Sequence, residues 1–134
     1  MVDTRLMQIG EVAERTGLSL RTIRYYGEVG LAEPSARSQG GFRLYTEPDV
    51  ERLKLIMRMK PLDFSLEEMG DLLGVLDRVH DAAGEEREEL LERLLAYRAA
   101  ADERARKLRK TLDVAEDFRR FMYEQSGRAA ADRA

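Results

Sequence analysis

The chain has 134 residues, of which 43% are hydrophobic and 37% are charged, and its formal net charge is -3. This composition suits a small soluble protein rich in helix rather than one built around a large core. With no Cys and a single His, disulfides, thiol nucleophiles and the usual zinc clusters are excluded. No apolar run approaches the roughly 20 residues of a membrane helix, and no signal peptide opens the chain, so a cytoplasmic location is expected.

The two halves of the chain differ in charge. Residues 1–60 carry 10 Lys and Arg against 8 Asp and Glu, whereas residues 61–134 carry 13 against 18. Positive charge is concentrated in residues 15–43, which contain five Arg and two acidic residues. The first half is therefore the better partner for a polyanion. The five are Arg15, Arg21, Arg24, Arg37 and Arg43.

The amino-terminal segment has the pattern of two short helices joined by a tight link. Residues 7–16 place apolar side chains at helical spacing, and Gly17 offers the left-handed conformation in which a helix can end. Ser19 is suited to cap a second helix that ends near residues 27–30. Two helices with so short a link predict a helix-turn-helix.

A turn rich in Pro, Ser and Gly follows at residues 34–41. Gly40 and Gly41 precede the short run at residues 42–45, which indicates a hairpin turn leading into a strand. We interpret this segment as a wing beside the helix-turn-helix.

Two capping boxes predict the next helices. The first capping box begins at Thr46 and predicts a helix from residue 47 to about residue 60. The second begins at Ser65 and predicts a further helix directly after it. The front domain is expected to span residues 1–76, followed by a linker at residues 77–84.

Residues 85–124 contain no Gly or Pro, and 40 helical residues would extend roughly 60 Å. Apolar residues recur every seven positions, which is typical of a dimerisation coiled coil. A competing stripe of Leu90, Tyr97 and Phe118 leaves the register open. Residues 125–134 are expected to form a disordered tail. The predicted dimerisation seam consists of Leu91, Leu94, Ala101, Ala105, Leu108, Leu112, Ala115 and Met122.

The Arg residues have two interpretations, because scattered surface Arg often only keep a face solvated. Arg21 and Arg24, however, lie at i and i+3 on the second helix, while Arg37 and Arg43 flank the glycine-rich turn. The guanidinium group binds phosphate or the guanine edge in a bidentate manner. Their placement therefore favours nucleic-acid contact from helix and wing together.

Three Tyr residues have more than one possible role. One of Tyr25 and Tyr26 is expected to pack in the core while the other faces a phosphate, because adjacent helical positions diverge by about 100°. Tyr45 either packs beneath the wing or contacts a phosphate. The full set of candidate DNA-binding residues is Ser19, Arg21, Thr22, Arg24, Tyr25, Tyr26, Arg37, Arg43 and Tyr45.

No catalytic constellation stands out. His80 lies among acidic residues that could hold a weak divalent ion, although a solvated linker accounts for them better. The acidic run at residues 85–89 suits the first turns of a helix. There is no phosphate-binding Gly loop and no Ser/His/Asp set, so we expect no enzyme activity, no cofactor and no bound metal.

Five blocks of residues cover much of the first half of the chain. They are Ile9-Gly10-Glu11-Val12-Ala13, Thr16-Gly17-Leu18-Ser19-Leu20-Arg21-Thr22-Ile23-Arg24-Tyr25-Tyr26, Gly30-Leu31, Gly41-Phe42-Arg43-Leu44-Tyr45 and Phe64-Ser65-Leu66-Glu67-Glu68. In the order and spacing of these blocks, residues 7–76 resemble the amino-terminal domain of the MerR family of bacterial transcription factors. The resemblance implies a mainly α fold: a winged helix-turn-helix with a small β-hairpin wing, followed by a long antiparallel coiled-coil dimerisation helix.

The resemblance also implies a function. A homodimer would bind a pseudo-palindromic promoter site and distort its spacer to activate or repress transcription, with RNA polymerase as a further partner. Recognition-helix contacts are implied for Arg21, Arg24 and Tyr26, and wing contacts for Arg37, Arg43 and Tyr45. Two alternatives are a coiled-coil adaptor that binds another protein, and a regulator whose sensing domain lies on a separate chain.

The resemblance bears on control as well. Metal and redox sensors of the family use Cys, which this chain lacks, so no metal or thiol response is expected. Control is then expected through protein level, a partner, or a small ligand near the ends of the dimerisation helix. The lining expected for such a ligand is Tyr97, Phe118, Phe121, Met122 and Tyr123. The alternative, which the sequence favours, is that these side chains only pack the far end of the coiled coil on the front domain of the partner.

Overall fold

The computed structural model describes residues 5–133. Two compact units divide the chain at residues 1–94 and 95–134. Among the described residues, no helix is long and apolar enough to cross a membrane. The elements in chain order are β1 (Met7–Gln8), α1 (Ile9–Thr16), α2 (Leu20–Glu28), β2 (Ala36–Arg37), β3 (Arg43–Tyr45), α3 (Glu47–Met59), the 3-10 helix η1 (Lys60–Leu62), α4 (Leu66–Arg78) and α5 (Gly84–Ala131).

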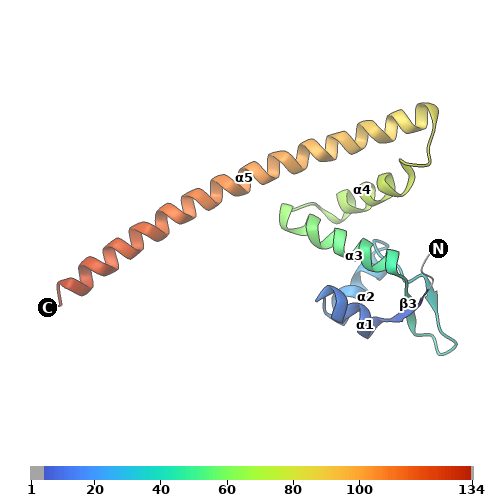
Figure 1. Cartoon of the computed structure of the whole chain (residues 1–134), viewed down its shortest axis with the longest axis horizontal. Coiled ribbons are helices and arrows are strands. Elements are labelled where there is room, and N and C mark those ends of the chain that lie inside the picture. Colours follow the sequence, from blue (N-terminus) through green and yellow to red (C-terminus); the bar gives the residue numbers. More distant parts are fainter. Residues whose placement is uncertain (1–4, 134) are drawn as a thin grey trace. The chain divides into compact units, whose positions relative to one another are not determined.

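Helices α1 and α2 form the predicted helix-turn-helix (Figure 1). Helix α1 ends at Gly17, whose φ of 78° few other residues tolerate and whose N–H donates to the Ala13 carbonyl at 2.8 Å. Ser19 caps α2 by accepting the Thr22 N–H at 3.1 Å. Ile23 of α2 is fully buried. The apolar face of α2 therefore lies in the core and leaves the opposite face to solvent.

A three-stranded antiparallel sheet of order β1-β3-β2 forms the wing. Residues 7 and 8 were expected to belong to the first helix, which is wrong. They pair instead with β3, Met7 opposite Tyr45. Helical spacing is a local signal, whereas this pairing joins segments far apart in the chain.

The tip of the wing is a tight turn. The N–H of Gly41 donates to the Ser38 carbonyl at 2.9 Å, and Gly41 has a φ of 82°. The N–H of Ser38 donates to the Phe42 carbonyl at 2.9 Å, which closes the hairpin. This turn sets β2 and β3 side by side and confirms the predicted hairpin.

Both predicted capping boxes are present. The Thr46 hydroxyl accepts from the Asp49 N–H, and the Asp49 carboxylate accepts from the Thr46 N–H at 2.9 Å. Ser65 and Glu68 repeat the exchange at the start of α4. Each box satisfies two backbone donors that a helix start leaves without partners. Helices α3 and α4 therefore begin where the sequence predicted.

Two Arg side chains link these elements. Arg15 of α1 forms a two-point ion pair with Glu47 of α3, one bond being 2.7 Å long. Arg52 of α3 donates to the Leu31 carbonyl at 2.6 Å and to both carboxylate oxygens of Asp77. Arg15 thus stabilises the first compact unit, which is called the front unit below, by joining α1 to α3.

The Arg15–Glu47 pair predicts a pH dependence of stability. The hydrogen bond from Arg15 lowers the pKa of Glu47 below its ordinary value of 4.5. The pair therefore stabilises the fold above that value, and its contribution is lost as the pH falls through the lowered pKa. We expect Glu47→Gln to flatten the decline in the free energy of unfolding on acidification, measured by denaturant titration. A decline as steep as that of the wild type would contradict this.

The start of α5 packs on α4. Val75, Val79 and Leu90 form a buried cluster, with Ala82 and Leu94 packed against it. An ion pair between Arg93 and Asp71 joins the same two helices. The front unit consequently extends beyond the expected boundary at residue 76, because the apolar face of α4 is covered by the first turns of α5.

Residues 125–134 were expected to form a disordered tail, but helix α5 continues to Ala131. Residue 134 lies outside the described residues. Residues 129–131 are three consecutive Ala, the residue with the highest helix propensity, and they offset the roughly 1 kcal/mol cost of Gly127. The Ser126 hydroxyl also donates to the Tyr123 carbonyl at 3.1 Å.

Candidate nucleic-acid interface

One face of α2 presents charged and aromatic side chains to solvent. Arg21, Arg24 and Tyr25 are exposed and lie at i, i+3 and i+4, so they share a face. Ile23 and Tyr26 lie on the buried side. The helix therefore offers two guanidinium groups and one phenol on the surface that a recognition helix would turn toward a groove.

The structure distinguishes the two adjacent Tyr residues. Tyr25 is 43% exposed, whereas Tyr26 is 4% exposed. The side chain of Tyr26 faces the core in this structure, and the recognition contact that the resemblance implies for it stays a prediction. Tyr25 is the residue of the pair that can reach a phosphate.

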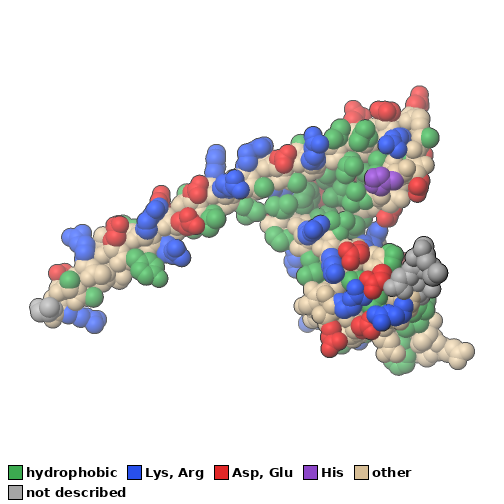
Figure 2. Space-filling view, viewed as in Figure 1, with side chains coloured by type: hydrophobic (Ala, Val, Ile, Leu, Met, Phe, Trp, Pro, Cys, Tyr) green, Lys and Arg blue, Asp and Glu red, His purple; other side chains and the backbone are tan. Residues whose placement is uncertain are grey.

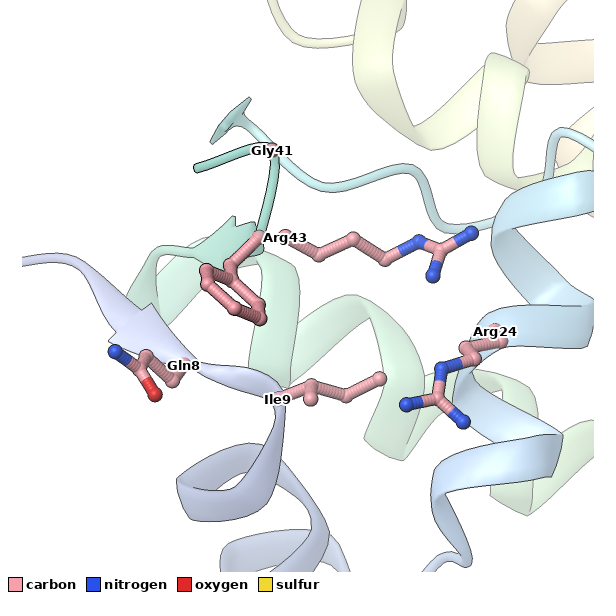
Figure 3. A pocket seen from close by; sticks show the side chains of 6 residues that line it. Gln8, Ile9, Arg24, Gly41 and Arg43 are labelled. Atoms are coloured by element: carbon pink, nitrogen blue, oxygen red, sulfur yellow. The ribbon is translucent and has the colours of Figure 1, made fainter. Parts of the chain in front are cut away.

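Arg24 of α2 and Arg43 of β3 converge on one hollow (Figure 3). Figure 3 shows both guanidinium groups directed into the space between the wing and α2. The hollow has a volume of about 110 Å³. Helix and wing thus contribute to a single cationic surface. The hollow is lined by Gln8, Ile9, Arg24, Gly41, Phe42 and Arg43.

These Arg side chains differ from those that stabilise the fold. Within residues 5–133, Arg21, Arg24 and Arg43 form no hydrogen bond or ion pair, whereas Arg15 and Arg52 are fully engaged. A guanidinium group with five donors and no protein acceptor is free to bind an external anion.

Arg37 adds a further positive charge on the wing. It lies directly opposite Arg43 in the hairpin register and donates to the Gly41 carbonyl at 3.2 Å. Like charges directly across a strand pair are destabilising. An anion bound between them would offset this repulsion. Arg37 and Arg43 also line a second hollow of about 290 Å³ with Gly27, Glu28, Glu33 and Pro34.

Tyr45 packs beneath the wing instead of facing solvent. Its side chain is fully buried, and its hydroxyl has no hydrogen-bond partner among the described residues. Burial raises the pKa of Tyr45, and the charge of Arg43 opposes this shift. Of the two roles left open for Tyr45, the structure shows packing, and the wing contact that the resemblance implies stays a prediction. The packing follows from its pairing with Met7 of β1.

Ser19 and Thr22 serve as the cap of α2. The Ser19 hydroxyl donates to the Thr22 hydroxyl at 2.9 Å and accepts the Thr22 N–H. Both remain at the surface, Ser19 more so than Thr22. Their hydrogen-bonding capacity is directed mainly at holding the first turn of α2.

This cap yields a prediction that separates folding from binding. Ser19→Ala should lower the free energy of unfolding by about 1 kcal/mol. Ser19→Asp keeps a capping oxygen and should preserve stability, while its carboxylate repels a polyanion and weakens binding. Thermal unfolding and DNA titration of both variants check this. Equal DNA affinity for Ser19→Asp and wild type would place Ser19 away from the interface.

Phe42 belongs to the site but was absent from the candidate set. Its ring is 67% exposed at the wing tip and lines the hollow of Arg24 and Arg43. A side chain added at Gly40 would come within 3.1 Å of this ring, so the missing Cβ leaves room for it. The available signal was an aromatic residue placed directly after a double glycine.

The predicted dimerisation residues lie along α5. Leu91, Leu108, Leu112 and Met122 are between 38% and 55% exposed. Figure 2 shows apolar side chains interspersed with charged ones along this helix. Leu90, from the competing stripe, is buried against Val75 and Val79. Ala105 and Ala115 are also exposed, while Leu94 and Ala101 are half-buried.

The acidic residues around His80 do not assemble. In the part of the chain that the structure describes, no three His, Asp or Glu side chains are grouped closely enough to hold a metal ion. His80 is exposed in the loop between α4 and α5.

A helix-turn-helix joined to a cationic β-hairpin defines a winged-helix nucleic-acid-binding protein. Residues 7–74 match the family described as MerR HTH family regulatory protein, and residues 50–115 match the family described as MerR, DNA binding. The chain belongs to the MerR family, whose members are transcriptional regulators and not enzymes. The predicted mainly α fold class, with its wing and long carboxy-terminal helix, is confirmed.

Several known proteins are similar to this chain. The mercuric resistance operon regulatory protein of Bacillus cereus is 45% identical over 71 residues, which cover 53% of this chain and 54% of that protein. ZntR of Escherichia coli strain K12 is 41% identical over 90 residues, 66% of this chain and 64% of ZntR. The chain thus spans between half and two thirds of these curated relatives.

A solved structure provides a further comparison. HiNmlR, a MerR family regulator lacking the sensor domain, is bound to promoter DNA in its crystal structure. It is 26% identical to this chain with a TM-score of 0.61, and the match covers 84% of this chain and 86% of HiNmlR.

Proposed function

We propose that this chain is a homodimeric transcriptional regulator that binds promoter DNA. The proposal rests on the convergence of Arg24 from α2 and Arg43 from the wing on one surface, where neither guanidinium group forms a hydrogen bond or ion pair within residues 5–133. The similarity to HiNmlR, which is bound to promoter DNA, supports it. The coiled-coil adaptor has no comparable support, because the family matches cover the DNA-binding segments.

The exposed face of α2 fits the role of a recognition helix in the major groove. Arg21 and Arg24 would bind base edges or phosphates there, with Tyr25 on the backbone. Arg43 and Arg37 would bind phosphates that flank the groove. Two copies related by two-fold symmetry would read a pseudo-palindromic site, and binding both half-sites would distort the spacer between them.

Footprinting on the DNA around the chain's own gene tests this function. We expect protection of two symmetry-related half-sites, with enhanced cleavage in the spacer where the duplex is distorted. The affinity should fall steeply with salt, because phosphate contacts release counterions. Binding that is equal on all sequences would contradict the proposal.

The exposed ring at the wing tip predicts a contact that does not depend on charge. Phe42→Ala should weaken binding to all DNA sequences by about fivefold and leave the salt slope unchanged, because an aromatic ring packs against sugars without neutralising phosphates. Leu66→Ala is the matched control, since Leu66 is also exposed but lies on α4. Fluorescence anisotropy at two salt concentrations measures both variants. An affinity for Phe42→Ala equal to that of the control would place the ring away from DNA.

The remaining partners follow from this function and stay predictions. A promoter-bound regulator acts on RNA polymerase, and binding to bacterial promoter DNA requires a cytoplasmic location. A small-molecule effector would use the aromatic segment of α5, where Phe118, Phe121, Met122 and Tyr123 are exposed. One relative is named a mercuric resistance operon regulatory protein and one similar solved structure is in complex with lead(II), but this chain contains no Cys to bind such metals.

A further inference from the structure

We propose that Arg52 is a positioning residue, which fixes the orientation of the recognition helix α2 relative to α4 and thereby determines the spacing of half-sites that the dimer accepts. This inference rests on the proposed function and deepens it, because it names the residues that set the distance between the two halves of the DNA site. Arg52 acts through other residues, since it does not line the hollow of Arg24 and Arg43.

The guanidinium group of Arg52 joins three segments of the front unit. From α3, its Nε donates to the Leu31 carbonyl at 2.6 Å, and its Nη1 donates to both carboxylate oxygens of Asp77 on α4 at 3.0 and 3.1 Å. The rigid fork of guanidinium donors lets one side chain bind both groups at once. Arg52 therefore holds the segment after α2 and the end of α4 in one arrangement.

Leu31 connects this bridge to the recognition helix. The Tyr26 carbonyl, near the end of α2, accepts the N–H groups of Leu31 at 2.9 Å and of Ala32 at 3.1 Å. The buried side chain of Leu31 also lies close to α4, because a Cβ added at Gly70 would come within 3.4 Å of it. A movement of α2 would therefore displace the carbonyl group that Arg52 holds.

Packing alone does not fix α3 against α4 beside this bridge. A groove of about 310 Å³ is lined by residues of both helices, among them Arg52 and Asp77. Its apolar lining consists of Leu55 of α3 with Leu73 and Leu76 of α4. Side chains that line an open groove do not interdigitate across it, so they leave freedom in the angle between the helices. The Arg52–Asp77 ion pair restricts this freedom.

Helix α4 connects the bridge to the first turns of α5. Asp71 of α4 forms an ion pair with Arg93 of α5, and the buried apolar cluster described above joins the same two helices. Residues 84–94 of α5 belong to the front unit. Since α5 is the proposed dimerisation helix, the orientation of α2 relative to these turns contributes to the distance between the two recognition helices of a dimer.

Half-site spacing is the property that this bridge would control. One additional base pair moves a half-site by about 3.4 Å along the duplex and rotates it by about 34°. A dimer with a fixed orientation of α2 must distort the DNA to follow that change, and the distortion weakens binding. A dimer with a loosened α2 follows the change more easily, so it loses its preference. The contacts to one half-site are the same in both cases.

Asp77→Ala is the informative variant, because it removes the bridge to α4 and leaves the hydrogen bond to the Leu31 carbonyl in place. Asp77 is exposed, so loss of its ion pair should change the melting temperature little. Asp77→Glu keeps a carboxylate and should keep the wild-type behaviour. Glu51→Ala is the matched control, since Glu51 lines the same groove but forms its ion pair with Lys54 inside α3.

Selection from a pool of duplexes of random sequence measures the spacing that each variant prefers. The wild-type chain should enrich paired half-sites with one dominant spacing, and Asp77→Ala should enrich the same half-sites with several neighbouring spacings. The affinity ratio between the preferred spacing and one base pair more should fall about fivefold for Asp77→Ala, while the affinity for a single half-site stays within about twofold. Asp77→Glu and Glu51→Ala should keep the wild-type ratio.

A wild-type ratio for Asp77→Ala would overturn the positioning role of Arg52. An equal loss of affinity for single and paired half-sites would overturn it as well, because that pattern indicates damage to the fold. The same holds if Glu51→Ala changed the ratio as much, or if Asp77→Glu did not restore it, since the effect would then not come from the bridge. A wild-type chain that enriched no paired half-sites would remove the proposed function itself, which the other outcomes leave intact.

Discussion

Replacing Arg21, Arg24 and Arg43 together by Ala is expected to abolish specific DNA binding. Loss of Arg21 or Arg24 should each cost roughly 1 to 3 kcal/mol and relax specificity where the residue reads a base. Loss of Arg43 should weaken all sequences about equally, as a phosphate contact does. The slope of log affinity against log salt should fall by about 0.9 for each phosphate contact removed.

The fold should survive this triple replacement, because none of the three side chains has a protein partner within residues 5–133. Arg128→Ala is the control, since it removes an exposed Arg far along α5. Fluorescence anisotropy over a salt series measures the variants singly and together. If the triple variant kept the affinity and salt slope of the wild type, α2 and the wing would not be the interface.

Leu108→Asp is expected to convert the dimer to monomers. Leu108 is 49% exposed in the single chain, and its burial against a second copy would become the burial of an unpaired carboxylate. Sedimentation over a concentration series measures the change. DNA affinity should fall at least a hundredfold, because a monomer engages one half-site and loses the second, linked contact.

Val114→Asp is the matched control for this prediction. Val114 is 69% exposed on the same helix but lies outside the seam, so its variant should stay dimeric. An intact dimer for Leu108→Asp would move the contact elsewhere on α5. The stripe through Tyr97 and Phe118 would then be the next candidate surface.

The sequence by itself determined the features that depend on neighbouring residues. Gly17 ends α1, Ser19 caps α2, and the boxes at Thr46 and Ser65 start α3 and α4 as predicted. Each of these devices joins groups within four residues of one another, so the pattern of residues contains the whole interaction. The placement of Arg21 and Arg24 on one helical face has the same local origin.

The tertiary structure decided the roles that depend on distant segments. Tyr45 is buried where β1 pairs with β3. Of the two adjacent Tyr residues, Tyr26 packs in the core and Tyr25 stays exposed. Arg15 forms an ion pair with Glu47, so its guanidinium group is not available to a ligand. The fold of the wing places Arg43 and Arg24 at the same hollow. Such contacts form only after the chain folds back on itself, because burial and charge pairing depend on distance in space and not on separation along the sequence.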